Sequence, residues 1–159
     1  MLARRPYAIA EMRQALEKKF SQKELVAEAI ARLRELGYLD DRRFAEQYAY
    51  SLAQNRGYGP HRLRRELRNK RVNFDYIEPA VAHAYEAAPP QSLLDRALDK
   101  KLRGLRLPLS RARVHSLCQS LMRLGFNAGD IIKAVRARPE LTSQSDDIEP
   151  VELEGCNGE

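Results

Sequence analysis

The fold of this chain is decided by residues 57–84, which read GYGPHRLRRELRNKRVNFDYIEPAVAHA. A glycine-rich break precedes Pro60, a residue that suits the first turn of a helix. Leu63 and Leu67 then lie four residues apart on one helical stripe, and the apolar residues of 77–81 also fall at helical spacing. The stretch therefore predicts two short amphipathic helices and shows no strand-like alternation of apolar and polar residues.

The same apolar pattern occurs three times in the chain, at a period of roughly fifty residues. The three sets are Met12, Leu16, Val26, Ala29 and Ile30; Leu63, Leu67, Ile77, Ala80 and Val81; and Leu117, Leu121, Ile131, Ala134 and Val135. A further helix precedes each of the later two sets, marked by Phe44, Tyr48 and Leu52 and by Leu94, Leu98 and Leu102. The sequence therefore predicts two complete three-helix units, about 41–87 and 91–138, after a first unit of about 7–36 that lacks its leading helix.

Units of this size cannot bury their apolar faces alone, so they must stack on their neighbours. We therefore expect an all-α fold, a curved and elongated array of three-helix repeats. The expected helices are 8–20, 22–36, 41–55, 60–71, 75–87, 91–104, 110–124 and 127–138. In the first unit we also expect Phe20, Leu25 and Leu36 to lie on the buried stripes.

Polar residues mark several expected helix ends. Ser21–Glu24 and Asp75–Glu78 read as capping boxes at helix starts, and Gly37 reads as a helix stop. Asp40 and Asp41 lie where a helix N-terminus needs acceptors and negative charge. A metal-binding carboxylate pair is the alternative for these two aspartates, and capping is the interpretation that we favour.

Charge is distributed unevenly along the chain, whose formal net charge is +6. Residues 140–159 contain seven carboxylates and no Lys or Arg, so residues 1–139 hold all 28 basic residues against 15 acidic ones. We expect 1–139 to form the helical domain and 140–159 to be a disordered acidic tail. A body this basic favours a polyanionic partner, either nucleic acid or an acidic protein surface.

The sequence argues against a membrane or secretory destination. No apolar run approaches the length of a membrane span, and the first residues lack the apolar segment of a secretory signal. The two cysteines, Cys118 and Cys156, are too few for a disulfide framework. We therefore expect a cytoplasmic protein that makes no membrane contact.

Basic residues gather in two clusters that are candidate contact surfaces. The first cluster is Arg56, Arg62, Arg64, Arg65, Arg68, Lys70 and Arg71. The second is Arg96, Lys100, Lys101, Arg103, Arg106, Arg111 and Arg113, centred on Lys100, Lys101 and Arg103. Arginine suits bidentate contact with carboxylate or phosphate, although such charges can also serve solubility alone. Because Arg64, Arg65 and Arg68 lie off the Leu63/Leu67 stripe, we expect them to project outward and to contribute little to folding.

No set of residues suggests an enzyme. The three histidines, His61, His83 and His115, fall in separate expected helices. His115 and Cys118 are one helical turn apart, a spacing found in metal sites, but no second pair completes such a site. Cys118 lies among leucines, so a buried structural thiol is the favoured interpretation. We expect no catalytic residue, no metal and no cofactor.

Two motifs make the chain similar to a known family. The first is Gly37-Tyr38-Leu39-Asp40-Asp41-Arg42-Arg43-Phe44-Ala45, and the second is Arg56-Gly57-Tyr58-Gly59-Pro60-His61-Arg62-Leu63-Arg64-Arg65-Glu66-Leu67-Arg68. Both resemble the RecX family, and the similarity covers roughly 7–138. It includes Leu124-Gly125-Phe126, which looks like the family's Arg-Gly-Phe turn.

The resemblance implies an array of three three-helix repeats and a modulator, mostly an inhibitor, of the RecA recombinase. Members of the family bind in the groove of the RecA–DNA filament, block its extension and lower its ATPase and strand-exchange activity, and some also bind DNA. For this chain it implies a monomeric regulator in homologous recombination, DNA repair and the SOS response. The implied partners are the RecA filament and single- or double-stranded DNA. A stand-alone basic nucleic-acid-binding protein is the alternative, and the long acidic tail departs from the family pattern.

Overall fold

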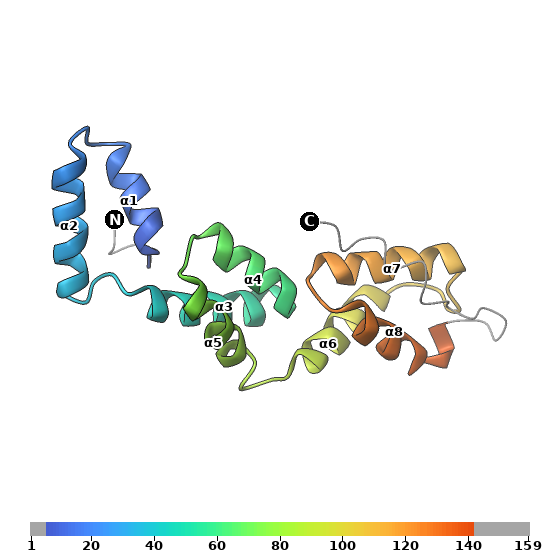
Figure 1. Cartoon of the computed structure of the whole chain (residues 1–159). Coiled ribbons are helices and arrows are strands. Elements are labelled where there is room, and N and C mark those ends of the chain that lie inside the picture. Colours follow the sequence, from blue (N-terminus) through green and yellow to red (C-terminus); the bar gives the residue numbers. More distant parts are fainter. Residues whose placement is uncertain (1–5, 142–159) are drawn as a thin grey trace. The chain divides into compact units, whose positions relative to one another are not determined.

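A computed structural model describes residues 6–141 of the chain. This part forms eight α-helices and one short 3-10 helix, η1, and contains no strand (Figure 1). The helices are α1 (Ile9–Glu17), α2 (Lys23–Glu35), α3 (Asp41–Arg56), α4 (Pro60–Asn69), α5 (Phe74–Ala84), α6 (Pro90–Leu102), α7 (Arg111–Arg123), α8 (Ala128–Arg136) and η1 (Pro139–Leu141). The all-α prediction is confirmed, and most of the expected helices are a few residues shorter than predicted.

The chain divides into two compact units. The first comprises Met1–Asn55 and Leu63–Ala87, and the second comprises Arg56–Arg62 and Ala88–Glu159. In the first unit α1 and α2 lie side by side as a hairpin, and in the second α6 packs against both α7 and α8 (Figure 1). None of the helices within 6–141 is both long enough and apolar enough to span a membrane.

The apolar repeat positions form the cores of these units. In the second and third sets every predicted position is buried, and Leu63, Leu67, Leu121 and Ile131 are completely so. In the first set Met12, Val26 and Ile30 are buried and pack together with Leu39. The helical period therefore placed these two sets of core residues correctly, and Tyr48 and Leu102 of the preceding helices are only partly buried.

Three residues that the sequence assigns to buried stripes lie on the surface instead. Phe20, Leu25 and Leu36 are each more than half exposed. Ala29 is also exposed, although its counterparts in the two later sets are buried. Phe20 lies beyond the end of α1, so it is not on a helical stripe. Leu25 and Ala29 are exposed because α1 covers only the side of α2 that carries Val26 and Ile30, and no helix precedes α1 within the described residues.

Both predicted capping boxes are absent. Helix α2 begins after Gln22, with no side-chain cap, so Ser21–Glu24 does not act as a box. Helix α5 begins after Asn73, whose side-chain oxygen accepts the backbone N–H of Asp75 at 3.2 Å, so Asn73 caps this helix. The predicted stop at Gly37 is confirmed, because its φ of 72° closes the end of α2 in a conformation that favours glycine.

The folded part of the second unit continues past residue 139, the predicted end of the helical domain. Leu141 in η1 is completely buried, and its carbonyl accepts the backbone N–H of Leu109 at 2.9 Å. Helix α8 packs against η1. The rest of the predicted disordered tail, 142–159, lies outside the described residues.

Residues 59–62 are held against the turn between α7 and α8. The N–H of Gly59 donates to the Leu124 carbonyl at 2.7 Å, and the N–H of His61 donates to the Gly125 carbonyl at 3.1 Å. The two glycine backbones approach so closely that a Cβ on Gly59 would clash with the carbonyl of Gly125. Glycine at both positions therefore lets the start of α4 pack closely against this turn.

Candidate partner-binding surface

The residues of the first predicted cluster lie along α4 and just before and after it. The complete burial of Leu63 and Leu67 fixes which face of α4 points inward and therefore which side chains remain outside. The seven cations do not behave alike: some are held by partners within the protein, and others reach solvent.

Arg62 lies in the first turn of α4. One of its guanidinium nitrogens donates to the Arg123 carbonyl at 2.9 Å, and the guanidinium carbon lies 4.0 Å from the centre of the Tyr58 ring. Such a cation–π contact adds to the hydrogen bond in fixing the side chain. Arg56 is exposed and donates to the Tyr58 hydroxyl at 3.5 Å. Arg62 therefore fastens the start of α4 to the end of α7.

Arg64 pairs with Glu78 on α5 rather than extending freely from the surface. Its Nε and Nη2 atoms donate to the two carboxylate oxygens of Glu78 at 2.7 and 2.9 Å. The hydrogen bond from Arg64 holds the pKa of Glu78 below its ordinary value, and the charges of Arg64 and Arg68 act in the same direction. The prediction that Arg64 projects outward was therefore wrong, because α5 places a carboxylate opposite it.

Lys70 is the third cation with an internal partner. Its ammonium group lies 2.8 Å from a carboxylate oxygen of Glu11 on α1 and 5.7 Å from the centre of the Tyr48 ring. Both side chains of the ion pair are largely shielded from solvent. Lys70 therefore ties α4 to α1 and to α3.

Three arginines on α4 and just after it are exposed to solvent: Arg65, Arg68 and Arg71. Arg71 has a φ of 56°, in the left-handed region where the chain turns from α4 towards α5. Close to it, Phe74 at the start of α5 is 66% exposed, and sequence reasoning gave no sign of this. Three guanidinium groups and one aromatic ring thus face solvent along one short piece of chain.

The second predicted cluster lies at the end of α6 in the second unit. Lys100, Lys101 and Arg103 are all exposed. The two lysines occupy the last turn of α6, where positive charge complements the helix dipole. Within residues 6–141 the side chains of these three make no hydrogen bond or ion pair, whereas Arg62, Arg64 and Lys70 of the first cluster each do.

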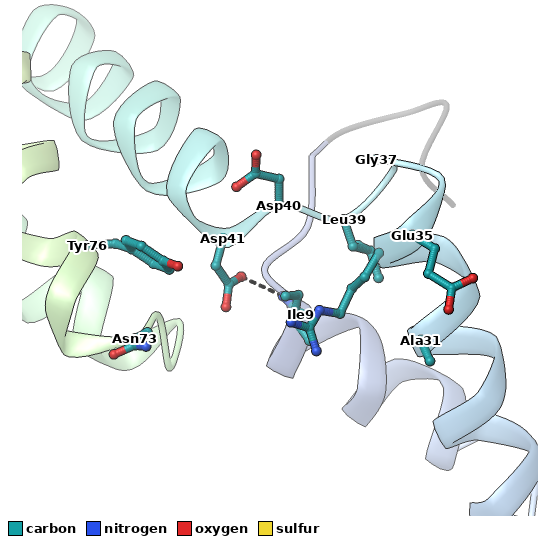
Figure 2. Close-up of a pocket in the computed structure, with 10 residues that line it drawn as sticks. Ile9, Ala31, Glu35, Gly37, Leu39, Asp40, Asp41, Asn73 and Tyr76 are labelled. Carbon is teal, nitrogen blue, oxygen red and sulfur yellow. Dashed lines mark hydrogen bonds between the residues drawn. The ribbon is translucent and has the colours of Figure 1, made fainter.

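The aspartates that could have formed a metal pair have structural roles. A hollow of about 760 Å³ opens beside them, between α2 and the start of α5 (Figure 2). Asp40 caps α3 by accepting the Arg43 N–H at 3.1 Å, and Asp41 accepts the Ile9 N–H at 2.8 Å, which ties α3 to α1. Burial raises the pKa of Asp41, although the Ile9 hydrogen bond opposes this. The capping interpretation is confirmed for Asp40.

The remaining residues considered for chemistry are equally structural. Cys118 is buried, and this burial raises the pKa of its thiol, as expected for a core cysteine. His83 lies 3.1 Å from Glu86 on the surface. Across residues 6–141, no group of three or more His, Cys, Asp or Glu side chains is placed to hold a metal ion.

These features define an all-helical repeat protein with exposed arginine and lysine clusters. A family model described as RecX, second three-helix domain, matches residues 40–81. A regulatory protein RecX of Thermobifida fusca is 31% identical over 143 residues, covering 88% of this chain and 75% of that protein. One from Halorhodospira halophila is 31% identical over 140 residues, covering 88% and 84%. The chain belongs to the RecX family of regulatory proteins.

Other relatives differ in length or are known as structures. The regulatory protein RecX of Oceanobacillus iheyensis is 29% identical over 91% of this chain, which spans about half (53%) of that longer protein. The crystal structure of RecX from Lactobacillus salivarius matches with a TM-score of 0.70 and 19% identity, covering 86% of this chain and 88% of that one. A second crystal structure of regulatory protein RecX gives 0.72 and 20%, covering 85% and 66%. The solved structures support the helical fold.

Proposed function

We propose that this chain binds in the groove of the RecA–DNA filament and restrains RecA, lowering filament extension, ATPase activity and strand exchange. It does so as a cytoplasmic monomer without catalytic chemistry or cofactor. The observation that carries the proposal is the row of exposed arginines, Arg65, Arg68 and Arg71, on a chain of the RecX family. The family relationship supplies the partner, and the arginines supply a surface for it.

The three arginines suit an interface with acidic groups. A guanidinium group can bind a carboxylate or a phosphate through two parallel hydrogen bonds. Because Leu63 and Leu67 anchor α4 from the opposite side, the helix presents Arg65 and Arg68 to solvent, and Arg71 follows in the turn after it. Complementary charge of this kind speeds association and selects the partner. Lys100, Lys101 and Arg103 offer a second contact of the same sign.

The direct test is the DNA-dependent ATPase activity of RecA, measured with this protein at substoichiometric and stoichiometric ratios. We expect inhibition by the wild type and at least a tenfold weaker effect from the triple variant Arg65→Glu, Arg68→Glu, Arg71→Glu. Arg64 is left unchanged, because its reversal would also break the pair with Glu78. Lys18→Glu, Lys19→Glu, Lys23→Glu is the matched control, since it makes the same change in net charge at three exposed lysines elsewhere.

Each outcome bears on a separate part of the proposal. If the wild type leaves RecA activity unchanged at stoichiometric ratios, the assigned function is wrong. If the arginine variant is folded and inhibits as well as the wild type, the function can stand but this surface is not the contact. If the lysine control loses inhibition to the same degree, net charge rather than the α4 surface determines binding.

One observation favours a second function, binding of single-stranded nucleic acid without RecA. Phe74 is 66% exposed and follows closely after Arg71, and an exposed ring beside cations offers a base a stacking surface. Direct binding would weaken steeply with added salt as phosphate contacts release counterions. Binding to labelled single strands, compared between wild type and Phe74→Ala at several salt concentrations, tests this: equal affinities would exclude stacking on Phe74.

A further inference from the structure

The second unit carries a basic loop with two exposed leucines, which the proposed function does not explain. We call residues 100–113, from the end of α6 to the start of α7, the basic loop. Leu105 and Leu107 are 41% and 46% exposed within it. Its charged residues are all positive: Lys100, Lys101, Arg103, Arg106, Arg111 and Arg113. Solvent-exposed leucines among six cations are suited to a partner that is both apolar and acidic.

The nearest carboxylates in the sequence are already engaged elsewhere. Asp99, directly before the loop, forms an ion pair with Arg138, and Asp95 lies 3.9 Å from the same guanidinium. These two acidic groups therefore compensate Arg138, so they do little to offset the charges of Lys100, Lys101, Arg103 and Arg106.

The described chain ends beside this loop. The Leu141 carbonyl accepts the N–H of Leu109 at 2.9 Å, and both leucines are buried, so residue 142 begins next to the stretch that carries Leu105 and Leu107. Eighteen residues follow, 142–159, with the sequence TSQSDDIEPVELEGCNGE. They contain six carboxylates, no Lys or Arg, and the apolar residues Ile148, Val151 and Leu153 set among the acids.

The length of residues 142–159 and their composition both suit contact with the basic loop. An extended chain advances at most about 3.5 Å per residue, so Asp147 can lie anywhere within about 20 Å of Leu141. A segment tethered this closely has an effective concentration of the order of millimolar at its target. Six carboxylates with interspersed apolar side chains are the complement of six cations with two exposed leucines.

We propose that residues 146–154 dock on the basic loop of the same chain, with Ile148, Val151 and Leu153 against Leu105 and Leu107 and the carboxylates against the surrounding cations. The docked segment covers the second basic cluster, so an acidic partner must displace it to reach Lys100, Lys101 and Arg103. The first cluster on α4 is left open. This intramolecular contact does not depend on the function proposed above.

A spin label on the full-length chain tests the contact. Cys156 takes a nitroxide, whereas Cys118 is buried and its raised pKa keeps it unreactive; a Cys156→Ser chain that takes up no label confirms this. At low salt we expect the label to broaden the backbone amide signals of 103–111 far more than those of α1 and α2. Broadening no stronger than that caused by the same nitroxide free in solution overturns the proposal, as does broadening centred on Arg65–Arg71.

Two sets of variants separate specific docking from general charge attraction. Asp146→Asn, Asp147→Asn, Glu149→Gln, Glu152→Gln, Glu154→Gln removes five charges from the tail, and Leu105→Ser, Leu107→Ser removes the exposed apolar side chains of the loop. We expect each set to abolish most of the broadening, and because all the changed loop residues are exposed, the fold should be unaffected. If the effect persists in either set, that half of the contact is absent and the proposal as stated fails.

Discussion

Gly125→Ala is expected to destabilise the second unit more than an ordinary glycine replacement does. Gly125 has a φ of 93°, in a region that costs a residue with a side chain about 1–2 kcal/mol. In addition, a Cβ there would clash with the backbone nitrogen and the Cβ of Arg62. Forcing an atom into a packed site costs about 1–3 kcal/mol.

The two costs together amount to about 2–5 kcal/mol, a large share of the roughly 5–15 kcal/mol that stabilises a typical domain. Gly104→Ala is the matched control. Its φ of 80° imposes a similar backbone strain, but a Cβ there has no atom within 4 Å. The gain from a stiffer unfolded chain is the same in both variants, so it cancels between them.

Urea unfolding followed by circular dichroism measures the difference. We expect Gly125→Ala to lose about 1–3 kcal/mol more than Gly104→Ala. Gly59→Ala, which meets the Gly125 carbonyl without a positive φ, should fall between them. Equal losses in Gly125→Ala and Gly104→Ala would refute the argument, because they would show that the close approach of residues 59–62 to the α7–α8 turn contributes nothing.

Three further variants test other parts of the fold. Leu67→Asp should unfold the protein or lower its stability by several kcal/mol, because Leu67 is completely buried, while Leu36→Asp at an exposed site should not; equal melting temperatures for the two would contradict the core assignment. Glu78→Gln should lower the stability above pH 4.5, the ordinary carboxyl pKa, and have little effect in acid. The lowered pKa of Glu78 means that the stability gained from its ion pair with Arg64 is lost as the pH falls through the pKa of the folded state. An equal loss at pH 7 and pH 3 in urea unfolding would contradict this. Removing 142–159 should tighten nucleic-acid binding at low salt and lower the stability only slightly. Removing 139–159 should cost about 2 kcal/mol or more beyond this, through the loss of Leu141; equal stability of the two shortened chains would show that Leu141 is dispensable.

The sequence alone was enough to determine the helices, their order and most of the core. Helical spacing of apolar residues is a local signal, and here it is repeated three times, so each copy supports the others. The family was recognisable too, because its two motifs are contiguous stretches around residues 37–45 and 56–68. The basic clusters were visible as composition, since charge needs no structure to be counted.

The tertiary structure decided which members of those clusters are available to a partner. Arg64 and Arg65 are neighbours of the same type in the sequence, yet Arg64 is paired with Glu78 and Arg65 is exposed. Nothing local distinguishes them, because the partner carboxylate comes from the next helix and Lys70 likewise finds Glu11 far back in the chain. The same holds for Leu25 on α2: a residue is buried only if another element lies against it, and periodicity describes one helix without saying what covers it.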